Sequence, residues 1–227
     1  MNSLIYLLNS YTGRDSIVRT MSYFSLYLSS QTSGRCSRKL KMISEELSYC
    51  RLILRLFDDL PMLRFTLSYG LGREEKSVLL QFLGVLKNLI DQMYYPIEHI
   101  TWAAEKQLIK LNTATLNVTG SALWALSSYI SMIRALILMT ILQRKTVGLK
   151  NITIHEEIVK EQLELLLSAF KDVADVVIAI NYLPHGSLLW AGKLNTKQIG
   201  VFGIVSSLIR VLLLVRNSAK TETHKLK

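Results

Sequence analysis

Cysteine, proline and acidic residues are scarce in this chain, and each shortage excludes a class of protein. The 227 residues include two cysteines, three prolines and 17 acidic residues against 27 lysines and arginines. Cys36 and Cys50 cannot form a disulfide scaffold, and neither has metal-ligand spacing. The few acidic residues leave a formal net charge of +10. The sequence therefore predicts no disulfide framework and favours a reducing compartment.

Motifs for catalysis and for nucleotide binding are also absent from the sequence. The four histidines (His99, His155, His185, His224) are scattered and show no H-E-x-x-H spacing. Gly70 and Gly72 lack the third glycine of a dinucleotide site, and no G-x-x-x-x-G-K-[ST] loop occurs. Asp58 and Asp59 would point apart on a helix, so they indicate a helix end before Pro61. We expect no enzyme, no cofactor and no metal.

Hydrophobic residues, by contrast, make up half of the chain, and charged residues only 19%. The mean hydropathy is +0.27 and the pI is near 9.6. This composition favours a membrane protein, and the positive charge indicates an anionic partner. No basic stripe with interleaved aromatic residues appears, so nucleic acid is excluded as a partner in favour of an anionic lipid surface.

The stretch from Leu40 to Phe57 has the apolar spacing of an amphipathic helix. Basic residues gather where this helix begins. Such a helix can lie in a membrane interface, or it can pack on a protein core. For the membrane alternative, we expect one set of side chains to insert between lipids: Leu40, Ile43, Leu47, Ile53 and Leu54. A second set would bind lipid phosphates: Arg35, Arg38, Lys39 and Lys41.

Two later stretches are long and apolar enough to cross a membrane. Residues 120–142 would span about 34 Å as a helix, although Arg134 places a charge near the middle. Residues 198–215 form the second candidate, with a face of small residues suited to close helix contact (Gly200, Gly203, Ser206, Ser207). Arg210 could reach the headgroup layer from there. Asp172 or Asp175 could pair with Arg134.

Helices are also predicted for the rest of the chain. The helix after Arg14 would turn Ile17, Met21, Phe24 and Leu28 inward. In a long helix through residues 78–108, Pro96 should cause a kink or a restart. The helix of residues 152–183 has an acidic face and should pack on protein. The fold class is thus all-α, a helical membrane protein in which amphipathic N-terminal helices precede a long kinked helix and two apolar membrane-associated helices. We divide it into a membrane-surface region, 1–118, and a spanning region, 119–227.

Several ordered blocks resemble the peroxin-11 family, closest to its gamma type. They cover nearly the whole chain: Gly13-Arg14-Asp15 with Arg19 and Tyr23, Arg51 to Asp59, Tyr69 to Gly72, Asp91 to Pro96, Glu98-His99 with Trp102 to Ala104, Leu123 to Leu126, and Leu183-Pro184 with Leu189 to Gly192. The family usually has a basic residue where this chain has Ser16.

The resemblance implies a multi-pass protein of the peroxisomal membrane with both termini in the cytosol. It also implies a role in peroxisome elongation and fission through membrane remodelling. The implied partners are the protein itself as a homo-oligomer, sister peroxin-11 isoforms, a fission adaptor and a dynamin-related GTPase. Two other function classes stay open: an oligomeric pore for small anionic metabolites, lined by Arg134 and Arg210, and a soluble helical scaffold.

Overall fold

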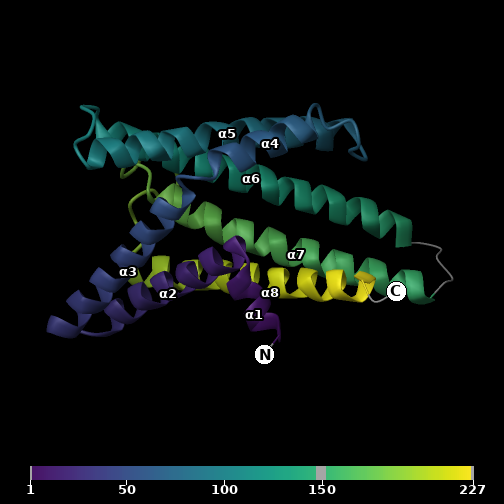
Figure 1. Cartoon of the computed structure of the whole chain (residues 1–227), viewed down its shortest axis with the longest axis horizontal. Helices are drawn as coiled ribbons and strands as arrows, with labels where there is room; N and C mark the ends of the chain where they lie inside the picture. Colours follow the sequence, from purple (N-terminus) through teal and green to yellow (C-terminus); the bar gives the residue numbers. More distant parts are fainter. Residues whose placement is uncertain (1, 147–151, 226–227) are drawn as a thin grey trace. The chain divides into compact units, whose positions relative to one another are not determined.

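The computed structural model describes residues 2–146 and 152–225, and every regular element in these ranges is a helix (Figure 1). The helices are α1 (Asn2–Asn9), α2 (Tyr11–Gln31), α3 (Gly34–Arg55), α4 (Asp59–Tyr69), α5 (Val78–Glu105), α6 (Thr113–Thr146), α7 (Ile152–Asn181) and α8 (Thr196–Lys225). The predicted all-α class is confirmed.

The helices form two compact units. The first comprises Met1–Arg51 and Asn195–Lys227, and the second comprises Leu52–Leu194. This division follows contacts between helices. Our division at residue 118 followed expected membrane contact, so it stays a prediction.

Small residues bring α8 against α2 in the first unit. A Cβ on Gly200 would lie 2.9 Å from Tyr27, and one on Gly203 would lie 2.1 Å from the Tyr23 ring. Ser206 and Ser207 are fully buried. The small-residue face that the sequence predicted on this helix is therefore its contact with α2, and close backbone approach is what such faces allow.

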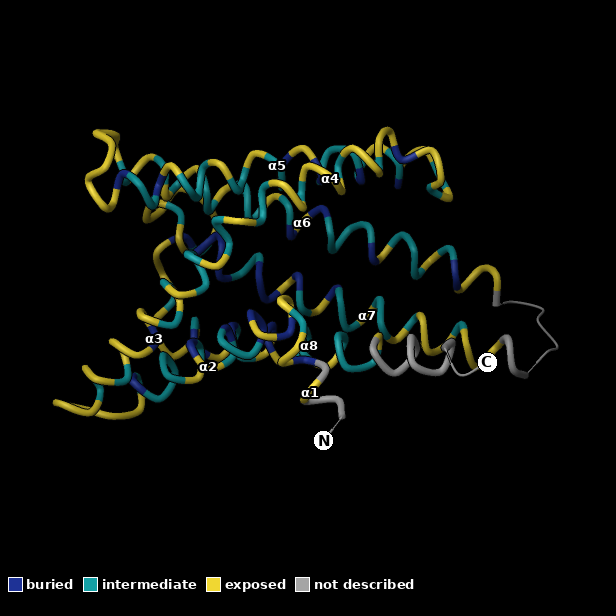
Figure 2. The backbone as a smooth tube through the Cα atoms, viewed as in Figure 1, coloured by how far each residue is buried: buried dark blue, intermediate teal, exposed yellow. Residues whose placement is uncertain are grey.

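The α2 helix buries polar residues and exposes apolar ones. Asp15, Arg19 and Ser22 are buried, whereas Met21 and Phe24 are about half exposed, at 53% and 51%. The expectation that Met21 and Phe24 point inward is wrong. Helical periodicity identified the apolar side of α2, but the neighbouring helices pack on the other side. Figure 2 shows this alternation along the helices.

Polar contacts also join α2 to α3. The Ser37 hydroxyl donates to the Ser29 carbonyl at 2.7 Å, and the Ser22 hydroxyl donates to the Ser44 carbonyl at 3.0 Å. Ser22 and Ser48 share a further hydroxyl hydrogen bond of 2.8 Å. The two helices therefore meet along a line of serines rather than along an apolar seam.

In the second unit α6 packs between α5 and α7, and α4 packs on α5. The Ser127 hydroxyl of α6 donates to Asp91 of α5 at 2.5 Å. At the same end of α6, Trp124 stacks on Tyr182, next to the last turn of α7, with ring centroids 6.3 Å apart. The α5 helix continues through Pro96, so the predicted long helix has proline inside it rather than a break.

The turn between α3 and α4 is fixed by residues of α5. His99 Nδ1 lies 2.8 Å from an Asp59 carboxylate oxygen, and Glu98 pairs with Arg55. The Tyr94 hydroxyl also donates to Glu98 at 3.0 Å. These contacts agree with the interpretation of Asp59 as a helix-end residue, since α4 begins there.

The contact between α8 and α2 yields a stability prediction. We expect Gly203→Val to destabilise the protein by roughly 1–3 kcal/mol, because its new side chain must displace the Tyr23 ring. Thermal unfolding in detergent measures the loss. Val205→Leu adds bulk at an exposed position two residues away and should change stability little. Equal stability of both variants would contradict the packing.

Candidate membrane interface

One side of α3 carries an apolar line that is partly exposed. Ile43 is 48% exposed and Leu54 37% exposed, while Leu40 and Leu47 are half-buried. We call Leu40, Ile43, Leu47 and Leu54 the α3 stripe. By helix geometry it lies about a quarter turn away from the serine line that contacts α2. The contact with α2 therefore does not use the α3 stripe.

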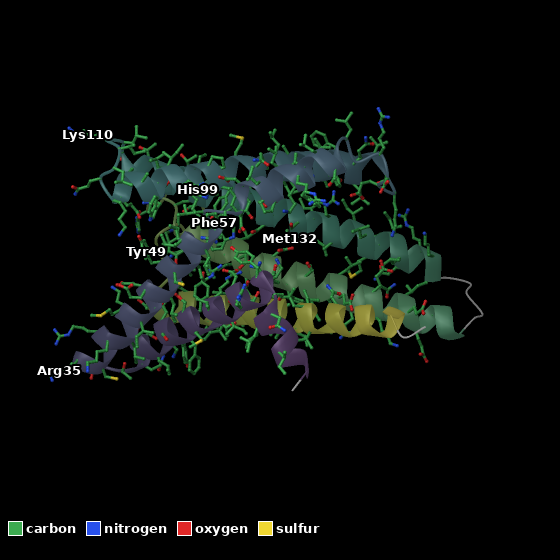
Figure 3. All side chains as sticks on the ribbon, viewed as in Figure 1. Arg35, Tyr49, Phe57, His99, Lys110 and Met132 are labelled. Carbon is green, nitrogen blue, oxygen red and sulfur yellow. The ribbon has the colours of Figure 1, made fainter. Side chains whose placement is uncertain are left out.

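The basic residues expected at this interface are all exposed. Arg35, Arg38 and Lys39 belong to the first turns of α3, and Arg35 projects from its end in Figure 3. Lys41 lies 3.9 Å from Glu45, in an exposed i, i+4 pair. Ile53, the remaining member of the predicted inserting set, is half-buried and turned about 100° from Leu54. Lipid contact by these residues stays a prediction.

A buried carboxylate ties α3 and α8 to α2. Asp15 accepts hydrogen bonds from Arg51 Nε at 2.7 Å and Arg51 Nη2 at 3.3 Å. Arg210 Nη1 lies 3.7 Å from Oδ2 of the same carboxylate, the oxygen that also accepts from Arg51 Nη2. The Asp15 side chain is only 6% exposed. The charge that the sequence placed in the second candidate span thus has an acidic partner within its own unit.

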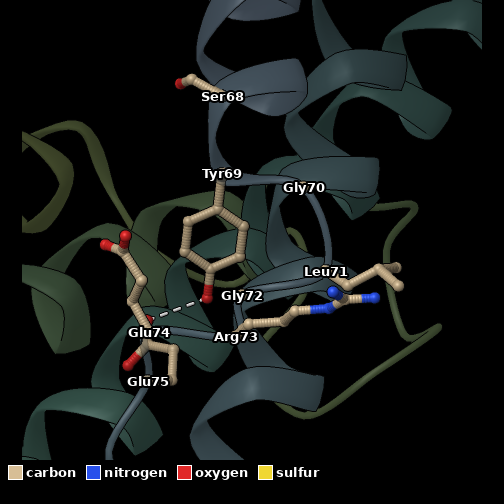
Figure 4. Close-up of a pocket in the computed structure, with 8 residues that line it drawn as sticks. All are labelled: Ser68, Tyr69, Gly70, Leu71, Gly72, Arg73, Glu74 and Glu75. Atoms are coloured by element: carbon tan, nitrogen blue, oxygen red, sulfur yellow. Dashed lines mark hydrogen bonds between the residues drawn. The ribbon is translucent and has the colours of Figure 1, made fainter.

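Arg134, the charge in the first candidate span, also has an acidic partner. Its Nη2 donates to Glu75 at 2.7 Å, and its Nη1 donates to the Leu80 carbonyl at 2.5 Å. The Tyr69 hydroxyl donates to the same Glu75 oxygen at 2.9 Å (Figure 4). The two acids considered as partners from the sequence, Asp172 and Asp175, lie beside Lys171 instead.

Gly84 makes room for this hydrogen-bond network. A Cβ at position 84 would lie 1.8 Å from the Tyr69 hydroxyl and 2.4 Å from Arg134 Nη1. Burial acts to raise the pKa of the Glu75 carboxyl, but hydrogen bonds from Arg134 and Tyr69 outweigh it, and the net pKa is lowered. Glu75 therefore holds its negative charge opposite Arg134 at neutral pH.

The described ranges contain no candidate metal centre. No group of three or more histidine, cysteine, aspartate or glutamate side chains could hold a metal ion there. Two helices have the length and composition to cross a membrane: Thr113–Lys145 and Thr196–Asn217. They contain the two spans predicted from the sequence.

Comparison with known proteins identifies the family of this chain. Residues 1–215 match the family described as "Peroxisomal biogenesis factor 11 (PEX11)". The chain belongs to the PEX11 family. It is 33% identical to mouse "Peroxisomal membrane protein 11C" over 98% of this chain and 97% of that protein, and 32% identical to the human protein of the same name over the same shares. A rice "Peroxisomal membrane protein 11-5" is 25% identical over 96% and 94%. No solved structure matches the sequence.

PEX11 membership confirms the resemblance found in the sequence blocks, including its gamma type. The chain is a peroxisomal membrane protein and a peroxisome biogenesis factor, and proteins of this family are not enzymes. Sequence reasoning missed the two acidic partners, Asp15 and Glu75. Asp15 lies in the Gly13-Arg14-Asp15 block, which marked its importance but not its contacts. Glu75 lies just before α5, and no local pattern in the sequence links it to Arg134.

The Glu75 network yields a pH-dependent stability prediction. A carboxyl whose folded pKa is depressed stabilises the fold above its unfolded pKa of about 4.3, and loses that effect as pH falls through the folded pKa. We expect Glu75→Gln to cost about 1–3 kcal/mol at pH 7, because Arg134 loses its anion. Unfolding in detergent should show this gap closing at pH 3. Glu74→Gln, at an exposed neighbour, is the control, and a gap of equal size at both pH values would refute the prediction.

Proposed function

We propose that this PEX11 protein promotes peroxisome elongation and fission by inserting the α3 stripe into one leaflet of the peroxisomal membrane. The observation that supports this function is the exposure of Ile43 and Leu54 on a helix whose polar contacts are made by serines and arginines. A partly exposed apolar side, on a helix with a basic beginning, is typical of an interfacial helix. This favours the membrane alternative over the packed-core alternative left open by the sequence.

The mechanism follows from the area that the helix would occupy. Side chains inserted at the level of the headgroups expand one leaflet relative to the other, and the bilayer bends toward the expanded side. Binding strength grows with buried apolar area and with charge attraction to anionic lipids. The exposed Arg35, Arg38 and Lys39 supply that charge at the helix start.

The first unit provides the anchor for this helix. Asp15 binds Arg51 near the end of α3 and lies next to Arg210 of α8, which has the length and composition to span the membrane. An inserted α3 would therefore be joined through one carboxylate to a membrane-spanning helix. A force exerted on the α3 stripe by the leaflet would therefore be transmitted through Asp15 to α8.

Partners and orientation belong to the same proposal. We infer a homo-oligomer that also pairs with sister PEX11 isoforms, so that many inserted helices act on one patch of membrane. A fission adaptor and a dynamin-related GTPase would then act on the elongated tubule. Cytosolic termini would place α3 on the cytosolic leaflet, where those partners are found.

The pore alternative receives less support from the contacts. Arg134 is bound by Glu75, and Arg210 lies beside Asp15, so neither arginine presents an unneutralised charge to an anion path. A cleft of about 340 Å³ includes Arg134, Lys87 and Lys171 in its lining, but each of these cations has an acidic partner. The pore would be favoured if proteoliposomes containing the protein conducted anions and if Arg134→Leu abolished that conductance.

The α3 stripe yields the central prediction of the proposed function. We expect Ile43→Glu to weaken binding of the full-length protein's α3 to the leaflet and to reduce peroxisome elongation at equal protein abundance. Losing one buried Ile removes about 1.5–3 kcal/mol, or about tenfold to a hundredfold in binding of a peptide covering residues 34–55 to anionic liposomes. Flotation and tubule imaging measure the two effects.

Met42→Glu is the matched control for this experiment. Met42 is 59% exposed and lies away from the α3 stripe on the same helix, so the charge change is equal but the apolar line stays intact. Normal elongation by Ile43→Glu, or equal defects in both variants, would show that the stripe does not insert.

The basic residues yield a separate, salt-dependent prediction. Replacing Arg35, Arg38, Lys39 and Lys41 together by glutamine should weaken binding to anionic vesicles strongly, since each cation contributes about 1 kcal/mol near such a surface. The difference from the native peptide should shrink as salt rises. Binding to neutral vesicles should change little. A loss of equal size on neutral vesicles would contradict a role in binding lipid phosphates.

A further inference from the structure

Hydropathy identifies α6 and α8 as candidate spans, but α5 also has an apolar exterior. Along the fully described α5, every exposed residue before Glu105 is apolar. Five of them recur at helical spacing, Val78, Phe82, Leu89, Met93 and Ile100, of which Leu89 is 56% exposed. Their spacing places them on one side of the helix over about 33 Å, which is the thickness of a bilayer core.

Charged residues of α5 are turned away from that side and are paired. Lys87 pairs with Asp91, and Glu98 pairs with Arg55. Exposed charges occur only before and at the end of the helix, at Arg73, Glu74 and Lys76 on one side and at Glu105 and Lys106 on the other. An apolar exterior bounded by charges at both ends is the surface of a helix that crosses lipid.

The α7 helix repeats this arrangement. Between Gln162 and Asn181 its exposed residues are Leu163, Leu166, Phe170 and Val173, and Phe170 is 58% exposed. The charged residues of that stretch are not exposed, and Lys171 holds Asp172 and lies 3.9 Å from Asp175. Exposed charges return toward the start of the helix, at Glu157, Lys160 and Glu161.

Contacts with α6 hold α5 and α7 beside a candidate membrane span. Ser127 and Arg134 of α6 bind Asp91 and the Leu80 carbonyl of α5. Trp124 of α6 stacks on Tyr182 beyond the end of α7. Since α6 packs on both helices along this length, a bilayer that α6 crosses must also surround its two neighbours.

We propose that α5 and α7 cross the membrane together with α6 and α8, so that the chain has four spans. Lipid hydrocarbon would cover the exposed sides of α5 and α7, and their inward ion pairs would explain why hydropathy alone misses them. The short α4 lies on α5 with Leu60, Leu67 and Phe65 exposed. Its one exposed cation, Arg64, can reach the interface while its carbon chain stays in lipid.

Four spans and two spans predict different sides of the membrane for four positions at or beyond the ends of these helices. With four spans, Glu74 and Lys110 face opposite sides because α5 lies between them, and so do Gln143 and Ser187 because α7 lies between them. With only α6 and α8 crossing, each pair shares a side. All four residues are exposed, and Lys110 is marked beyond the end of α5 in Figure 3.

The test is labelling of single cysteines in the full-length protein on intact peroxisomes. The natural Cys36 and Cys50 are first changed to serine, and one position of each pair is then changed to cysteine (Glu74→Cys, Lys110→Cys, Gln143→Cys or Ser187→Cys). A membrane-impermeant maleimide is applied before and after detergent, and resistance to alkaline extraction verifies membrane integration of each variant. We expect one member of each pair to react at once and the other only after detergent. If both positions of a pair react at the same stage, the helix between them does not cross the bilayer. That result would overturn the proposal for that helix.

Cysteines on the apolar exteriors distinguish lipid from a second copy of the chain. With lipid covering these sides, a bimane label on Leu89→Cys or Phe170→Cys should be quenched by brominated acyl chains, and oxidation should give no disulfide-linked dimer. Efficient dimer formation without quenching would assign the surface to a second copy and overturn the lipid assignment. Neither result depends on whether α3 remodels membranes.

Discussion

The shared carboxylate of Asp15 is the interaction on which the first unit depends. It is nearly inaccessible to solvent, and it is the acidic group beside two guanidinium groups, those of Arg51 and Arg210. A buried charge is stable only where its partners are held in place, and removing the common partner leaves the others buried without compensation. One side chain of α2 thus determines where both α3 and α8 can lie. No apolar contact in this unit has the same directional requirement.

Each unit, taken by itself, buries polar groups and exposes apolar side chains, and the second unit also buries apolar residues such as Leu80, Ile90 and Ile178. Serines, Asp15 and Arg19 are buried in the first unit, and Asn88, Asp172 and Asp175 are buried in the second. A water-soluble protein of this size would gain most of its stability from an apolar interior. Lipid reverses the preference, since an apolar exterior costs nothing there and an unpaired charge costs a great deal. The arrangement therefore agrees with residence in a membrane over more of the chain than the two most apolar helices.

The sequence was sufficient to predict the helices and to identify the side of α8 that contacts α2. Periodicity and small residues are local, so Gly200, Gly203, Ser206 and Ser207 could be assigned to a contact before any partner was known. The partner of Arg134 could not be predicted, because Glu75 is 59 residues away and several other acids were equally plausible. Periodicity also placed Met21 and Phe24 on one side of α2 but could not say whether protein or lipid would cover that side. Of the five residues predicted to insert, four share one side of α3 and Ile53 is turned away from them, while their insertion stays a prediction.

The serine line between α2 and α3 has a consequence for rotation. Hydroxyl hydrogen bonds at Ser22 and Ser29, together with the Arg51 pair, hold α3 at several points along its length. A helix held in this way cannot roll about its own axis to suit a surface. Whichever surface the stripe meets, the first unit must turn with it as one body. The tilt of that unit against the surface that the stripe meets is then set by the serine hydroxyl groups between α2 and α3, which lie away from that surface.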